Sequence, residues 1–276
     1  MPEILRSNAK VNLCLRITGR RADGYHTLSS IFQEIDLHDL LTFTPAADYS
    51  LSCDNPQIAC DRTNLCTRAY KAMQQIANSP SNWHIHLEKR IPIGAGLGGG
   101  SSNAATVIKF LNQVWQINRS ESELLQITTR LGADVAFFIR GKTQLAEGIG
   151  EQLFPITLLE DFIFLLICPL IQVSTRWAYQ QFNLTKKKEG YKFRRLFESG
   201  RIRWELFENQ FETVVFPAYP EIGIIKNQLL QKGALYAGLS GSGSTMFGIF
   251  KDRHCAASAR QLFTNYPTFI ALPVIN

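Results

Sequence analysis

Hydrophobic and polar residues alternate near the start of the chain. Apolar residues occupy the odd positions from 11 to 17, and Lys10 and Asn12 occupy even positions. A period of two is typical of a β-strand, whose successive side chains point to opposite faces. The pattern therefore predicts a strand in which Lys10 and Asn12 project from the same face.

Strand-like and helix-like stretches then follow one another along the rest of the chain. Thr63 is the predicted N-cap of a helix, Ser120 and Glu123 form a predicted capping box, and Gly132 is a predicted C-terminal cap. Strands and helices mix without a regular βαβ rhythm, which favours an α+β fold with two lobes, residues 1–150 and 151–276. The periodicity predicts strands at 27–37, 83–91, 162–168, 235–239, 245–250 and 268–272, and helices at 63–76, 174–182, 219–231 and 253–263.

Composition indicates a folded protein of a reducing compartment. The chain has 276 residues, of which 45% are hydrophobic, so it can bury a substantial core. Residues 1–10 lack the apolar stretch of a signal peptide, and no apolar run approaches the roughly 20 residues that cross a bilayer. The six cysteines are scattered and are expected to be small packing residues. We therefore expect a cytoplasmic protein without a membrane partner.

The net charge of +6 is concentrated in residues 186–203. This stretch holds eight basic and two acidic residues, which accounts for the whole excess. The favoured interpretation is a solvated segment. Attraction of an anionic substrate and binding of nucleic acid are the two alternatives.

The most unusual stretch is the glycine-rich segment, residues 92–103. Five glycines lie between positions 94 and 100, and an apolar stripe at positions 104, 108, 111 and 115 predicts a helix directly after them. Glycine amides and a helix N-terminus together suit a triphosphate. Ser101 and Ser102 can donate to phosphate oxygens or coordinate Mg²⁺. A purely structural turn is the alternative, but so many glycines make it entropically costly.

Two common nucleotide motifs fit this segment poorly. No Gly-Lys-Ser/Thr sequence follows, so it is not a Walker P-loop. A dinucleotide fold requires an acidic residue that ends a second strand about 20 positions later. Glu121 and Glu123 occur there at the start of a predicted helix, which disfavours a dinucleotide-binding dehydrogenase.

Three segments resemble, in order, the motifs of the GHMP kinases. They are Ala-Lys-Val-Asn-Leu at 9–13, Pro-Ile-Gly-Ala-Gly-Leu-Gly-Gly-Gly-Ser-Ser-Asn-Ala-Ala at 92–105, and Gly-Leu-Ser-Gly-Ser-Gly-Ser at 238–244. The resemblance implies a two-lobed GHMP kinase fold. The N-terminal lobe would be ribosomal S5 domain 2-like and would bind ATP, and the C-terminal lobe would be ferredoxin-like, with the active site in the cleft between them. The reaction implied is ATP- and Mg²⁺-dependent phosphorylation of an alcohol.

Further matches resemble one branch of this family. Gly-Tyr-His at 24–26 and Leu-Gly-Ala-Asp-Val at 131–135 are similar to the branch that phosphorylates the 2-hydroxyl of a cytidine diphosphate-linked sugar alcohol. Kinases of homoserine or of a mevalonate derivative remain alternatives, and an RNA-binding protein without catalytic activity is a third. We expect a small-molecule substrate, no nucleic-acid partner, and a monomer or weak homodimer.

The resemblance also implies a role for each matching residue. Asp134 would be the catalytic base and Lys10 its charged partner, an arrangement that suits proton removal from a hydroxyl. His26 would hydrogen-bond the cytosine edge, and an aromatic ring would stack on the base. Substrate-binding positions are Asn12, Tyr25, His26, Thr175, Tyr179 and Gly241. ATP-binding positions are Pro92, Ile93, Gly94, Ala95, Gly96, Leu97, Gly98, Gly99, Gly100, Ser101 and Ser102, with Asn64 and Lys89 near the adenine and with Ser101 and Ser102 as candidate Mg²⁺ ligands.

Each of these roles has a structural alternative. An isolated aspartate near a helix end is usually a cap or a surface residue, which applies to Asp134. An aromatic residue on a helix, such as Tyr179, is most often part of the core. Asn64 can simply start a helix, and a histidine in a turn, such as His26, is usually solvent-exposed.

Overall fold

The computed structural model describes residues 1–158, 160–169, 171–182, 196–198 and 201–275. They form two compact units that interleave along the chain. The first unit comprises Met1–Ala9, Leu37–Pro92 and Gly98–Gly141, and the second comprises Lys10–Asp36, Ile93–Leu97 and Lys142–Asn276. The predicted lobe boundary near residue 150 stays a prediction.

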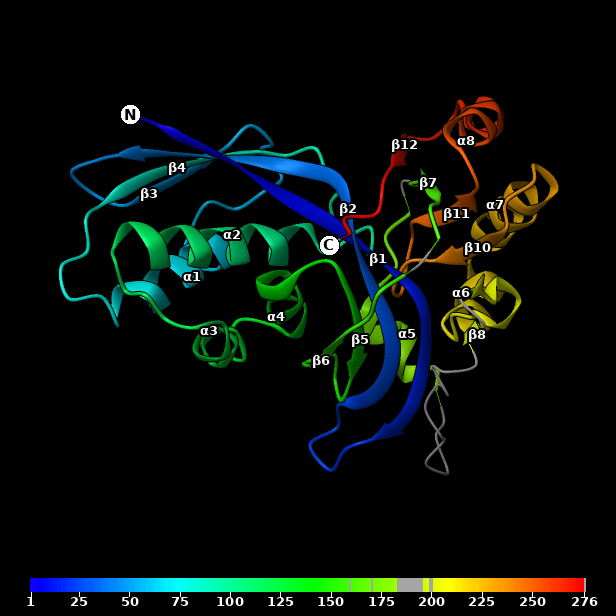
Figure 1. Cartoon of the computed structure of the whole chain (residues 1–276), viewed down its shortest axis with the longest axis horizontal. Coiled ribbons are helices and arrows are strands. Elements are labelled where there is room, and N and C mark those ends of the chain that lie inside the picture. The colour runs from blue at the N-terminus through cyan, green and yellow to red at the C-terminus, as the bar shows by residue number, and fades with distance from the viewer. Residues whose placement is uncertain (159, 170, 183–195, 199–200, 276) are drawn as a thin grey trace. The chain divides into compact units, whose positions relative to one another are not determined.

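Two long strands run through both units (Figure 1). They are β1 (Glu3–Arg20) and β2 (His26–Pro45). The end of β2 pairs with β4 in the first unit, where Leu40 faces Glu88, and its beginning pairs with β5 in the second, where Ser30 faces Ala146. The predicted strand at residues 10–17 is thus confirmed as part of β1.

The first unit packs helices on a small sheet. Phe110 of α2 stacks on Phe43 of β2 at 3.9 Å and meets Trp83 of β4 edge-on at 4.9 Å, so aromatic rings join the two layers. Helices α1 and α2 lie side by side (Figure 1). The elements are β3 (Ser50–Cys53), α1 (Leu65–Gln74), β4 (Trp83–Glu88), α2 (Gly99–Val114), α3 (Glu121–Thr128) and α4 (Ala133–Arg140).

The second unit contains a four-stranded antiparallel sheet in the order β10-β11-β7-β12. Helices α7 and α8 pack on this sheet, and the chain order β7, α7, β10, β11, α8, β12 gives the split βαβ topology of a ferredoxin-like lobe. The strands are β5 (Thr143–Glu147), β6 (Gln152–Pro155), β7 (Ile163–Ile167), β8 (Phe197–Glu198), β9 (Arg201–Ile202), β10 (Tyr236–Leu239), β11 (Met246–Phe250) and β12 (Thr268–Ala271). The helices are α5 (Thr175–Gln180), η2 (Trp204–Leu206), α6 (Glu212–Ala218), α7 (Pro220–Gln231), α8 (Arg253–Arg260) and η3 (Gln261–Phe263). The predicted α+β fold is confirmed.

Three details differ from the sequence predictions. Asn64, and not Thr63, caps α1, since its side chain accepts a hydrogen bond from the Cys66 amide. Gly132 precedes α4 and does not end α3, which finishes at Thr128. The capping box of Ser120 and Glu123 is confirmed. Most of the basic stretch 186–203 lies outside the described residues.

Cys14, Cys66 and Cys168 are buried, as expected of packing residues, whereas Cys53 and Cys255 are only partly buried and Cys60 is exposed. All six cysteines fall in described parts of the chain and are free thiols. Burial raises the pKa of Cys66 to about 12, as expected for an inert packing thiol. No helix among the described residues is long and apolar enough to cross a membrane.

Candidate active site

The glycine-rich segment ends at a helix N-terminus, as predicted. Gly94, Gly96 and Gly98 all have left-handed backbones, with φ of 66°, 79° and 71°. Helix α2 begins at Gly99, and its Ser102 amide donates to the Gly98 carbonyl. Left-handed conformations favour glycine strongly, so three of the five glycines are needed for this path of the backbone. The remaining glycines leave the first turn of α2 without side chains over its amides.

Within the second unit, parts of all three motifs meet. The Lys10 amide donates to the Leu97 carbonyl at 3.0 Å, and the Ser240 hydroxyl donates to the Gly96 carbonyl at 2.9 Å. The Thr245 amide donates to Ala95 at 3.2 Å. Residues 240–244, called here the second glycine turn, therefore hold the glycine-rich segment on one side and β1 holds it on another.

Gly96 has no room for a side chain. A Cβ at this position would lie 2.2 Å from the Ser240 carbonyl oxygen, and φ is also left-handed. We expect Gly96→Ala to weaken ADP binding about tenfold, because left-handed strain alone costs roughly 1–3 kcal/mol and the clash must displace the segment. Isothermal titration calorimetry with ADP measures the effect.

Gly94→Ala is the matched control for this substitution. Gly94 shares the left-handed backbone, with φ of 66°, but a Cβ there meets nothing within 4 Å. Its effect on ADP affinity should therefore be clearly smaller. Equal losses in the two variants would show that the contact between Gly96 and the second glycine turn does not matter for the nucleotide.

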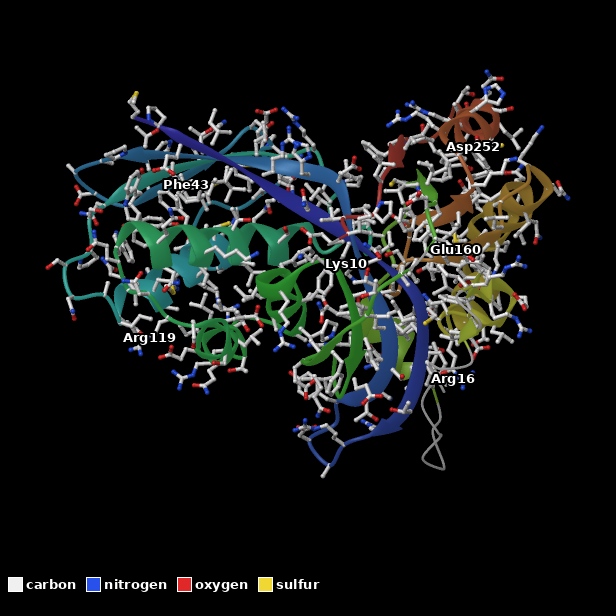
Figure 2. The ribbon with its side chains drawn as sticks, in the orientation of Figure 1. Lys10, Arg16, Phe43, Arg119, Glu160 and Asp252 are labelled. Atoms are coloured by element: carbon white, nitrogen blue, oxygen red, sulfur yellow. The ribbon has the colours of Figure 1, made fainter. Side chains whose placement is uncertain are left out.

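Lys10 and Asn12 share a face of β1, as the alternation predicts (Lys10 is labelled in Figure 2). The Lys10 Nζ donates to Asn12 Oδ1 at 2.5 Å and lies 5.0 Å from the Phe32 ring centroid. Asn12 in turn donates to the Ser30 hydroxyl at 3.1 Å. Lys10 is only 4% exposed. A buried ammonium held by a neutral amide can interact strongly with an anionic oxygen brought beside it.

His26 and Tyr179, two predicted substrate residues, stack on each other. Their ring centroids are 5.0 Å apart and the rings are 16° from parallel. The His26 Nε2 is buried and has no hydrogen-bond partner among the described residues. Burial, followed by repulsion from Arg20, lowers the His26 pKa below its usual value. A neutral imidazole with an unused ring nitrogen can hydrogen-bond a polar ligand edge.

The other predicted substrate residues lie in the same unit. Tyr25 is 63% exposed, so much of this residue is open to solvent. The hydroxyl of Thr175 hydrogen-bonds that of Ser242 at 2.8 Å. Gly241 adopts φ of 58°, and a Cβ there would lie 3.3 Å from Asn12 Oδ1. Gly241 is part of the second glycine turn, and Thr175 is linked to that turn through Ser242.

In the first unit, a carboxylate that the sequence reasoning missed organises the residues around the glycine-rich segment. Asp39 is fully buried and pairs with Lys89 at 2.5 Å. Its other oxygen accepts from the amides of Arg90 and Ile91, each at 2.8 Å. Asn103 of α2 donates at 2.9 Å to Oδ2, the oxygen of Asp39 that pairs with Lys89. Nothing in the sequence set Asp39 apart, because Glu34 and Asp36 lie in the same strand.

Lys89 and Asn64, the two residues predicted to lie near the adenine, each contact other residues of the first unit. The Lys89 ammonium is held by Asp39, and Asn64 caps α1 while donating to the Ala59 carbonyl at 2.7 Å. Ser102 is buried and accepts a hydrogen bond from Ser7 at 2.7 Å, and Ser7 accepts from Asn103 at 3.0 Å. The role of each in nucleotide binding stays a prediction.

Asp134 occupies the first turn of α4, in the first unit, and is partly exposed. No group of three or more His, Cys, Asp or Glu side chains that could hold a metal occurs among the residues the structure describes. Mg²⁺ commonly binds through one or two protein oxygens together with substrate phosphates. The Ser102 hydroxyl is buried and accepts a hydrogen bond from Ser7, and the roles of Ser101 and Ser102 as Mg²⁺ ligands stay a prediction.

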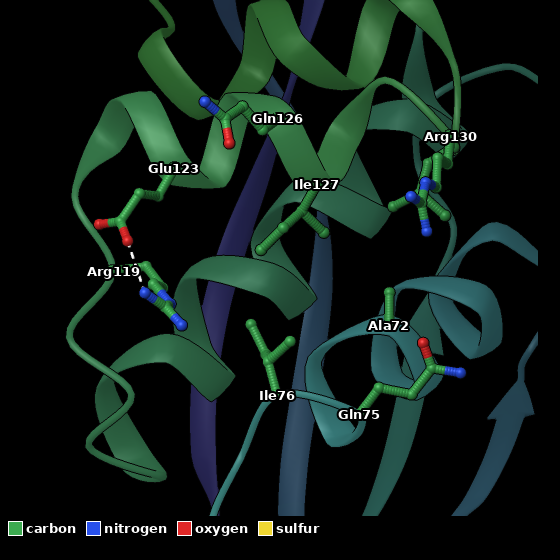
Figure 3. Close-up of a pocket in the computed structure, with 9 residues that line it drawn as sticks. Ala72, Gln75, Ile76, Arg119, Glu123, Gln126, Ile127 and Arg130 are labelled. Carbon is green, nitrogen blue, oxygen red and sulfur yellow. Dashed lines mark hydrogen bonds and ion pairs between the residues drawn. The ribbon is translucent and has the colours of Figure 1, made fainter.

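A pocket of about 420 Å³ in the first unit is lined by none of the predicted catalytic, ATP-binding or substrate-binding residues (Figure 3). It is bordered by α1 and α3, with Ile76 and Ile127 among its apolar residues. Arg119 pairs there with Glu123 at 2.6 Å, so that guanidinium is already neutralised. The pocket offers no assembled catalytic groups.

Comparison with known proteins agrees with this geometry. Residues 64–142 match the family GHMP kinases N terminal domain, and residues 193–266 match GHMP kinases C terminal. The mevalonate kinase of Methanococcus jannaschii superposes with a TM-score of 0.73 at 14% identity, covering 100% of this chain and 99% of its own, which shows the shared fold. The fold and the glycine-rich segment thus define a GHMP-type kinase.

More similar proteins narrow the class. A protein of Prosthecochloris aestuarii named 4-diphosphocytidyl-2-C-methyl-D-erythritol kinase is 42% identical over 95% of this chain and 94% of its own. A crystal structure of a 4-(cytidine 5'-diphospho)-2C-methyl-D-erythritol kinase superposes with a TM-score of 0.86 at 30% identity, covering 99% of this chain and 100% of the other. The chain belongs to the 4-diphosphocytidyl-2-C-methyl-D-erythritol kinase family, within the GHMP kinases.

Proposed function

We propose that this kinase transfers the γ-phosphoryl group of ATP to the 2-hydroxyl of 4-diphosphocytidyl-2-C-methyl-D-erythritol. The observation that carries the proposal is the 42% identity, over nearly the full length of both chains, to a kinase of that name. The His26 Nε2, which has no hydrogen-bond partner among the described residues, and the exposed side chain of Tyr25, the preceding residue, support a substrate with a polar aromatic base.

In the proposed reaction, Asp134 accepts the proton of the substrate's 2-hydroxyl. The oxygen of that hydroxyl forms a bond to the γ-phosphorus at the same time. The bond between the γ-phosphorus and the bridging oxygen breaks, and ADP leaves. Lys10 stabilises the developing negative charge, and residues 92–102 hold the triphosphate through backbone amides. Such positioning and charge stabilisation account for most of the catalysis of phosphoryl transfer. Mg²⁺, held by Ser101 or Ser102 and the phosphates, would neutralise phosphate charge.

A coupled assay of ADP release tests the proposal directly. We expect turnover with ATP and 4-diphosphocytidyl-2-C-methyl-D-erythritol, and none with homoserine or mevalonate. Turnover of one of those alcohols instead would favour the corresponding GHMP kinase. RNA binding that depends steeply on salt, without turnover of any alcohol, would favour the nucleic-acid alternative. We retain the predictions of a cytoplasmic enzyme that is a monomer or weak homodimer.

The lowered pKa of His26 predicts how KM for the cytidine substrate depends on pH. Because burial lowers that pKa below 6.5, the imidazole is neutral at pH 7 and becomes protonated only at a more acidic pH. If neutral His26 binds the cytosine, KM for the cytidine substrate should be level near pH 8 and should stay level as the pH falls toward the lowered pKa. It should then rise, approaching about tenfold per unit, once the pH is below the lowered pKa.

His26→Gln is the control for the pH profile. Glutamine keeps hydrogen-bonding groups but does not titrate, so its KM should stay level over the same range. A KM that rises equally in the wild type and the variant would assign the pH dependence to another group.

A further inference from the structure

Asn209 is a fully satisfied buried amide outside the three motifs. It lies between η2 and α6 and is 2% exposed. Its Nδ2 donates to the carbonyls of Leu239 and Gly241 at 2.7 and 2.8 Å, and its Oδ1 accepts from the Phe211 amide at 2.9 Å. Both donors are therefore used on the two carbonyls on either side of Ser240.

The backbone around Asn209 is itself fixed. The Leu15 amide donates to the Glu208 carbonyl at 2.8 Å, and the Gln210 amide donates to the Leu15 carbonyl at 2.9 Å. Asn209 is thus attached to β1, the strand that carries Lys10 and Asn12. Its side chain bridges that strand to the second glycine turn.

Nearby, Glu212 holds the same stretch of backbone. Its Oε1 accepts from the Leu239 amide at 3.0 Å, while Oε2 pairs with Lys226 at 2.5 Å. Leu239 is therefore fixed at its carbonyl by Asn209 and at its amide by Glu212. Leu239, the residue directly before the second glycine turn, is therefore held at both of its backbone polar groups.

The anchored turn contacts the glycine-rich segment directly. Ser240 donates to the Gly96 carbonyl, and the absence of a Cβ at Gly96 permits the close approach of the Ser240 carbonyl. A shift of the second glycine turn must therefore move Gly96 or break this hydrogen bond. All these residues belong to the second unit.

We propose that Asn209 is a positioning residue for nucleotide binding, acting on the glycine-rich segment through the second glycine turn. This inference rests on the proposed function, in which that segment holds the triphosphate. This positioning role requires two hydrogen-bond donors at Nδ2 of residue 209, one for the Leu239 carbonyl and one for the Gly241 carbonyl. Aspartate has nearly the same shape, but it would set a carboxylate oxygen against two carbonyl oxygens and so push the turn away.

The test compares Asn209→Asp with Asn227→Asp. Asn227 is exposed on α7 of the same unit, so the control introduces the same charge without disturbing the turn. We expect Asn209→Asp to raise the Kd for ADP and the KM for ATP about tenfold, which corresponds to about 1.4 kcal/mol. Asn227→Asp should leave both within twofold.

These readouts separate positioning from simple loss of folded protein. A merely structural role would lower the melting temperature and the amount of active enzyme, and would leave the Kd of the folded fraction unchanged. ADP affinity within twofold of the wild type in folded Asn209→Asp would overturn the inference. A wild type that binds ADP but does not phosphorylate the cytidine substrate would instead contradict the proposed substrate and leave this inference standing.

Ser240→Ala provides a second, independent variant. It removes the hydroxyl that joins the turn to Gly96 and leaves Asn209 intact, so we expect a loss of ADP affinity in the same direction. Because both substitutions act through one contact, the double variant should lose less than the product of the single losses. If Asn209→Asp does not fold, Ser240→Ala decides alone, and unchanged ADP affinity in it would overturn the inference.

Discussion

Replacing Asp134 with asparagine is expected to reduce kcat by about 10²–10⁴-fold, the range for loss of a general acid or base. The amide keeps the size of the side chain at the first turn of α4 but cannot accept the hydroxyl proton. Steady-state assays of ADP release with saturating ATP and cytidine substrate measure the change.

Folding and binding should survive this substitution. Asp134 is partly exposed, and asparagine is tolerated in the first turn of a helix, so the circular dichroism spectrum and ADP affinity are expected to match the wild type. Asp48→Asn, at an exposed residue of the same unit, should have unchanged kcat. A folded Asp134→Asn enzyme with kcat within threefold of the wild type would remove Asp134 from its proposed role.

Replacing Asp39 with alanine is expected to destabilise the first unit by about 3–5 kcal/mol, because it leaves a buried partner charge uncompensated. The side chain of Lys89 is only 6% exposed, and the amides of Arg90 and Ile91 would also lose their acceptor. Urea unfolding followed by circular dichroism measures the loss.

Two further variants identify the cause. Asp48→Ala removes an exposed carboxylate and should change the free energy of unfolding by no more than about 0.5 kcal/mol. The double variant Asp39→Leu with Lys89→Met removes both charges and should regain part of the loss. A destabilisation below about 1 kcal/mol in Asp39→Ala would show that the pair and its amide contacts are not the main support of this region.

Predictions that rested on neighbouring positions along the chain were the most successful. The shared face of Lys10 and Asn12 follows from strand geometry, and the capping box follows from the fixed spacing of a helical turn. The error at Thr63 has a local origin as well. Thr63 and Asn64 are adjacent residues that both favour an N-cap, so pattern alone leaves the boundary uncertain by a position.

By itself, the sequence determined the α+β class, the helix that follows the glycine-rich segment, and the ordered motifs that indicate a GHMP kinase. Only the tertiary structure decided which polar residues become buried supports. Asp39 follows His38, and Asn209 stands between Glu208 and Gln210, so neither differs from its polar neighbours in the sequence, and most of their partners lie 30 to 64 positions away. Burial requires such groups to find hydrogen-bond partners, but which partners they find depends on packing between distant segments. The order of residues near Asp39 or Asn209 therefore does not predict their hydrogen-bond partners.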